Sequence, residues 1–180
     1  MESKTLHTVQ GIAKAGKVIS KIVFICSIIG SDGCLIGILS LYAGVTQVLK
    51  FGGVTIHGII EKSADISLHS MYAAMIIGII LCISELVLSK IAERYFKNEL
   101  AAGTPFTVEG SAELKRLGIY TICIPLAAML LSEIAYHLML WNYEDIAEMS
   151  LDNFASVGLG IGFIVVSLIC RCGAEMKETH

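Results

Sequence analysis

Four long apolar runs, each bounded by charged residues, dominate this sequence. They cover residues 22–49, 71–91, 117–141 and 154–170. A mostly apolar run of about 18 residues or more is long enough to cross the hydrocarbon core of a bilayer as a helix. Because lipid offers the backbone no hydrogen-bond partner, a helix is the form in which such a run crosses. The sequence therefore predicts an all-α, polytopic membrane protein with four transmembrane helices.

The composition leaves little chain for anything outside these helices. Of the 180 residues, 55% are hydrophobic and only 16% are charged. This profile is typical of a small membrane protein and differs from that of a soluble domain. We expect a single membrane domain over residues 1–180, with an outer loop at 50–70 and a cytoplasmic helix–turn–helix connection at 92–116.

The basic residues predict the orientation of the chain. All of the 13 Lys and Arg except Lys50 and Lys62 lie before the first run, around the connection 92–116, or after the fourth run. Short cytoplasmic segments carry an excess of Lys and Arg, so both termini and this connection are expected inside the cell. The sequence predicts an antiparallel four-helix bundle, N-in and C-in, as a multi-pass protein of the plasma membrane.

Small residues recur at helical spacing along the runs. Such stripes let helix backbones approach closely, which drives helix association in lipid. We expect them to be the interior seams of the bundle, although one of them could equally be the interface of a homo-oligomer. The glycines assigned to helix packing are Gly30, Gly33, Gly37, Gly44, Gly78, Gly158 and Gly162.

Local signals predict the connecting segments. Gly103 is placed to end the second helix, Pro105 prevents its continuation, and Thr107 can cap the next helix. In residues 51–60, β-branched side chains surround glycines, which indicates a short extended hairpin or a re-entrant cap. Residues 1–20 fit either a helix lying on the inner leaflet or a basic flank that only sets the orientation.

The connection 92–116 also carries a family resemblance. A helix ending in Tyr95-Phe96 is followed by Gly103-x-Pro105-Phe106 and then by Leu114-x-Arg116-Leu117-Gly118. This order resembles the YoaS-like family of four-span bacterial membrane proteins, whose molecular function is uncharacterised. The resemblance implies a similar length and topology, and genes that often lie beside a small helix-turn-helix regulator. It implies no catalytic residues.

Ionisable residues within three of the runs are the candidate functional groups. Asp32, Glu85 and Glu133 lie inside runs, and His137 lies one helical turn after Glu133. A charged side chain at the centre of a membrane helix costs about 2.5–3.5 kcal/mol on insertion scales. We therefore expect these four side chains to turn toward the interior of the bundle.

Three interpretations of these groups remain open. Protonated carboxyls could bond to Ser27, Ser31, Ser84, Ser132 or the backbone and hold helices together, because burial favours the neutral form. The four groups could instead line a proton or cation path through a polar core. A metal bound by Glu133 and His137, with His69, is the third interpretation, although one Glu-x-x-x-His pair is a weak signal.

The leading functional hypothesis is a small membrane sensor or regulatory protein that acts through a protein partner. The alternative is a transport protein that conducts protons or cations past Asp32, Glu85 and Glu133. We expect no enzyme activity, because the sequence has no nucleophile elbow and no phosphate-binding loop. We also expect no cofactor, no resident metal and no nucleic-acid partner, since no basic face with interleaved aromatic residues is present.

Overall fold

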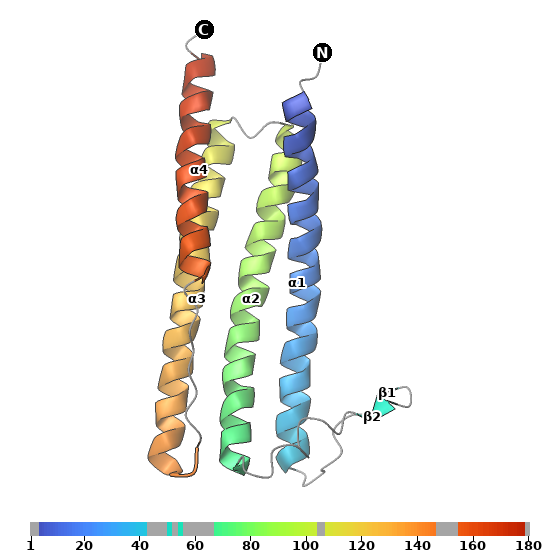
Figure 1. Cartoon of the computed structure of the whole chain (residues 1–180), viewed down its shortest axis with the longest axis vertical. Helices are drawn as coiled ribbons and strands as arrows, with labels where there is room; N and C mark the ends of the chain where they lie inside the picture. Colours follow the sequence, from blue (N-terminus) through green and yellow to red (C-terminus); the bar gives the residue numbers. More distant parts are fainter. Residues whose placement is uncertain are drawn as a thin grey trace. The chain divides into compact units, whose positions relative to one another are not determined.

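The computed structural model describes residues 4–42, 50–51, 54–55, 67–103, 107–146 and 155–178. Figure 1 shows its four long helices and one small hairpin. The helices are α1 (Lys4–Tyr42), α2 (Leu68–Ala102), α3 (Val108–Asn142) and α4 (Ala155–Glu178). Strands β1 (Lys50–Phe51) and β2 (Val54–Thr55) pair antiparallel. The all-α prediction is confirmed. Of the two alternatives for residues 51–60, a hairpin or a re-entrant cap, the described residues form the hairpin, and residues 56–60 lie outside the described part of the chain.

All four helices are long and apolar enough to cross a membrane, over Gln10–Tyr42, Leu68–Ala102, Val108–Asn142 and Val157–Glu175. About 20 helical residues suffice for the hydrocarbon core. Helices α2 and α3 have 35 residues each and α1 has 39, so each is longer than the core requires. Residues 4–20 continue α1 without a break, and neither expectation for this segment included such an extension.

Many side chains on the exposed surface of the helices are large and apolar, which indicates that lipid surrounds these helices. Ile29 is 66% exposed, Leu130 67% and Ile169 63%, and many other large aliphatic side chains are also exposed. Soluble monomers rarely expose contiguous apolar surface on this scale. In a bilayer this exposure carries no hydrophobic cost, because lipid tails are as apolar as the side chains. The protein is therefore a multi-pass membrane protein.

The turn between α2 and α3 forms as the local residues predict. Gly103 has φ +72°, in the left-handed region that glycine tolerates best, and its amide donates to the carbonyl of Glu99 at 3.1 Å. Thr107 Oγ1 accepts a hydrogen bond from the amide of Gly110 at 2.9 Å. This is an N-cap, so both helix ends at this turn have the predicted residues. Pro105 lies outside the described residues.

The chain packs as two compact units. Unit 1 contains residues Met1–Cys26, Ser84–Ala127 and Asp152–His180, and unit 2 contains Ser27–Ile83 and Ala128–Leu151. Helices α1, α2 and α3 each contribute residues to both units, whereas α4 belongs to unit 1. The single membrane domain over residues 1–180 stays a prediction.

Within unit 1, aromatic and small residues bring the helices together. Tyr95, Leu114 and Leu117 form a buried cluster, against which Phe96 and Phe163 pack. The ring of Phe96 fills the space beside Gly16, where an added Cβ would lie 2.5 Å from the ring. Helices α3 and α4 meet at Gly118 and Gly160, where the backbones themselves are in contact.

Within unit 2, a second buried cluster joins α2, α3 and the segment after α3. It contains Ala73, Ile77, Tyr136 and Ile146. Helices α1 and α2 approach at small residues. An added Cβ would lie 2.9 Å from Cys82 Sγ at Gly30, 2.6 Å from Met75 at Gly37, and 3.0 Å from Cys34 Sγ at Gly78.

The other predicted packing glycines have different surroundings. Gly33, Gly158 and Gly162 have open space where a Cβ would lie, and Gly44 lies outside the described residues. On α4 the residue in close contact is Gly160, which lies between the two glycines assigned from the sequence. The Gly-x-Gly-x-Gly pattern therefore packs through its central member, since neighbouring members point about 200° apart around the helix.

Candidate functional site

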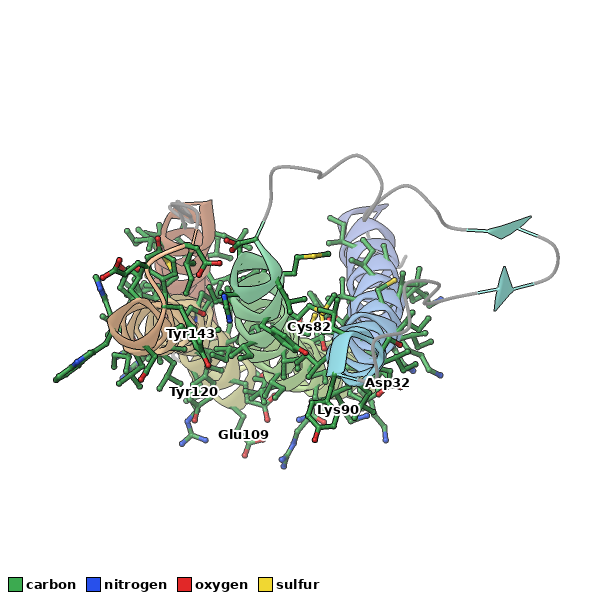
Figure 2. All side chains as sticks on the ribbon, turned by 90° about the horizontal axis from the view of Figure 1, so that it is seen from below. Asp32, Cys82, Lys90, Glu109, Tyr120 and Tyr143 are labelled. Atoms are coloured by element: carbon green, nitrogen blue, oxygen red, sulfur yellow. The ribbon has the colours of Figure 1, made fainter. Side chains whose placement is uncertain are left out.

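The four predicted polar-core residues, Asp32, Glu85, Glu133 and His137, all occupy exposed positions. This differs from the expectation that they turn inward. Figure 2 shows Asp32 on the side of α1 away from Cys82, the α2 residue that contacts Gly30. Asp32 lies two residues after Gly30, hence about 200° around the helix from the contact face. The polar path through these residues stays a prediction.

Of the predicted groups, the structure brings only Glu133 and His137 together. The Glu133 Oε1 and His137 Nε2 atoms lie 3.3 Å apart, with side chains 53% and 67% exposed. His69, the third group considered for a metal, lies instead against Asp145. Among the described residues, no group of three or more His, Cys, Asp and Glu side chains is placed to hold a metal ion.

Two of the serines considered as partners for the acids, Ser31 and Ser132, form no hydrogen bond with a carboxyl among the described residues. Ser31 Oγ donates to the carbonyl of Ile28 on its own helix at 2.9 Å. Ser132 is fully buried, and within the part of the chain that the structure describes its hydroxyl has no hydrogen-bond partner. These two side chains therefore do not hold the carboxyls in place.

A polar cluster joins the start of α2 to the segment after α3. We call it the α2–α3 clasp, and it consists of Ser67, His69, Ser70, Tyr143 and Asp145. His69 Nδ1 lies 2.9 Å and 3.0 Å from the two carboxylate oxygens of Asp145, and its ring stacks on Tyr143 with centroids 3.9 Å apart. Ser67 Oγ donates to the Asp145 carbonyl at 2.6 Å, and Ser70 Oγ does so at 3.3 Å.

The clasp has an electrostatic consequence at Asp145. The hydrogen bond from His69 holds the pKa of the Asp145 carboxyl below its ordinary value. The clasp fixes the chain where it leaves α3, and the residue after Asp145, Ile146, enters the buried cluster of unit 2. Its two sides are 76 residues apart in sequence, so no local pattern could have predicted it.

A second polar region consists of the charged helix ends in unit 1. Asn98 Nδ2 donates to the Glu113 carboxylate at 2.9 Å and 3.1 Å, which joins α2 to α3. Lys90 Nζ lies 4.8 Å from the centroid of the Phe24 ring, which joins α2 to α1. Asn98 and Glu113 lie beyond the apolar runs, whereas Lys90 and Phe24 lie near the ends of theirs. Together these contacts link α1, α2 and α3 within unit 1.

Exposed ion pairs occur in both polar regions. His69 and Asp145 pair between α2 and the segment after α3, with side chains 36% and 52% exposed, whereas Lys90 and Glu93 pair within α2. Comparisons with family models, with curated proteins and with solved structures found no match to this chain.

Proposed function

We propose that the chain is a plasma-membrane sensor or regulatory protein, a member of the YoaS-like family, that acts through a protein partner. In this proposal the four helices form an antiparallel bundle with both termini in the cytoplasm. The distribution of Lys and Arg supports the orientation, because nearly all of them flank the cytoplasmic ends of the predicted spans.

The observation that carries the proposal is the packed, charged extension of the helices in unit 1. Residues 92–102 and 108–116 lie beyond the apolar runs and still form regular helix, joined through Asn98 and Glu113. A rigid polar surface that continues directly from membrane helices can pass a change in the helices to a protein in the cytoplasm. Its exposed charged residues include Arg94, Lys97 and Glu109.

Site-specific photo-crosslinking in native membranes tests this proposal. A photoreactive residue in place of the exposed Lys97 should form an adduct with a second protein. The matched control replaces Leu130, which is 67% exposed within an apolar run and should contact lipid. Absence of any protein adduct at position 97 under conditions that label lipid at position 130 would contradict the regulatory function.

The exposed acids favour one alternative, proton or cation transport. Three apolar helices each keep one exposed carboxyl within a predicted span, at Asp32, Glu85 and Glu133, in spite of its cost in lipid. Copies of the chain that pack on these surfaces would enclose the acids in a shared polar path.

Ion flux into liposomes tests the alternative directly. Transport predicts flux, read with a pH-sensitive dye, that is lost in Glu85→Gln. It should be retained in Glu109→Gln, which changes an exposed acid outside the apolar runs. No flux under any ion gradient would remove this alternative.

A further inference from the structure

A basic groove lies between α3 and α4 within unit 1. The cavity has a volume of about 430 Å³. Lys115, Arg116 and Arg171 are the charged side chains in its lining, and Ile119 and Leu168 lie in the same lining. Among the described residues, no acidic side chain lines this groove.

Helical spacing explains why these residues share one groove. Lys115 and Ile119 are four residues apart on α3, and Ser167 and Arg171 are four residues apart on α4, so each pair lies on one helix face. The close approach of the two backbones at Gly118 and Gly160 holds these faces side by side. The groove is therefore built by the packing of the two helices and does not depend on a loop.

The groove lies where the apolar runs end. Arg116 is the last charged residue before the run 117–141, and Arg171 is the first after the run 154–170. Residues at this position along a membrane helix lie at the level of the lipid headgroups. Ile119 is 40% exposed and Leu168 is 56% exposed, so apolar surface begins directly below the basic side chains. The basic side chains would therefore face the phosphate of a phospholipid, and Ile119 and Leu168 would face its acyl chains.

One of the three basic side chains of the groove, Arg171, is paired with an acid. Arg171 Nε donates to Glu175 Oε1 at 2.8 Å, but a guanidinium has further N–H donors on its terminal nitrogens. The groove between α2 and α3, of about 310 Å³, also contains Arg116 together with Arg94. Glu113 lines that second groove, and its carboxylate would repel a phosphate. The α3–α4 groove is therefore the better anion site.

We propose that the α3–α4 groove binds the phosphate headgroup of an anionic phospholipid. Lys115, Arg116 and Arg171 supply the charge, and Arg side chains can form two parallel hydrogen bonds with phosphate oxygens. Free phosphate shares this headgroup chemistry but lacks the acyl chains that cover Ile119 and Leu168. The lipid is therefore the ligand to which the whole groove is complementary.

Native mass spectrometry of the full chain in nonionic micelles tests the site, with phosphatidylglycerol and phosphatidylcholine as the two probes. The chain should retain phosphatidylglycerol in clear preference to phosphatidylcholine. Each basic residue near a lipid surface contributes to affinity, so Arg171→Gln should weaken binding about fivefold. The triple change Lys115→Gln, Arg116→Gln and Arg171→Gln should weaken it about a hundredfold.

Lys97→Gln is the matched control, since it removes one exposed positive charge that does not line the groove. It should bind phosphatidylglycerol as the unchanged chain does, and circular dichroism should show the same helix content in every variant. Equal retention of the two lipids, or equal losses in Lys97→Gln and Arg171→Gln, would overturn the proposal. Displacement of the lipid by an equal concentration of inorganic phosphate would also overturn it, because the site would then recognise phosphate alone.

Discussion

Replacing Gly160 by Ala should push α3 and α4 apart. A Cβ at position 160 would lie 2.8 Å from the carbonyl oxygen of Gly118 and would also meet Ile122. Conversely, a Cβ at position 118 would lie 2.9 Å from the carbonyl oxygen of Gly160. Ordinary van der Waals contact of a Cβ begins at 3.4 Å. Because backbone oxygens cannot rotate away as side chains do, the helices must separate by about half an ångström.

The size of the effect follows from this separation. A gap of about 0.5–1 Å removes a quarter to a half of the attraction at each contact. Overpacking of this kind costs about 1–3 kcal/mol. The higher helix propensity of Ala offsets up to about 1 kcal/mol of this cost. We therefore expect Gly160→Ala to lower the free energy of unfolding by up to about 2 kcal/mol.

Gly162→Ala is the matched control for this substitution. It lies on the same helix and gains the same propensity, but its Cβ would have open space within 4 Å. The difference between the two variants isolates the packing cost, about 1–3 kcal/mol. Equilibrium unfolding in mixed micelles, followed by circular dichroism, measures it. Equal stability of Gly160→Ala and Gly162→Ala would refute the close backbone contact between α3 and α4.

Two further predictions concern the ends of the helices. His69 lowers the pKa of Asp145 in the fold, so the clasp contributes stability above the ordinary carboxyl pKa and loses it as the pH falls through the lowered value. Stability measured against pH should show this acid-side loss in the unchanged chain, and Asp145→Asn should abolish that part of the profile. Thr107→Ala removes the side-chain acceptor of the α3 N-cap and should cost about 1 kcal/mol in the same unfolding assay, and an unchanged midpoint would argue against the cap.

Sequence patterns predict the features of this fold that depend on neighbouring residues. Gly103 and Thr107 end and begin helices through contacts within four residues, so their roles can be predicted from the local sequence. The four spans follow in the same way from the length of each apolar run.

The contact face of each helix is harder to predict, because it depends on residues distant in sequence. A stripe of small residues marks a helix face that can pack closely but does not identify the partner helix. The stripe therefore predicts packing at Gly158 and Gly162, whereas the close contacts are at Gly160 and Gly118. The cost of a charged group in lipid predicts that Asp32 turns inward. The contacts at Gly30 and Gly37 place it on the other side.

Three native cysteines allow a direct test of the central claim that lipid surrounds these helices. Cys26 and Cys123 are exposed within the apolar runs, and Cys172 is exposed just beyond the fourth run. In lipid nanodiscs, a water-soluble maleimide should modify Cys172 quickly and leave Cys26 and Cys123 unmodified, because the reactive thiolate forms only in contact with water. In dodecyl sulfate all three should react. Modification of Cys26 and Cys123 in nanodiscs as fast as Cys172 would contradict a membrane-spanning fold.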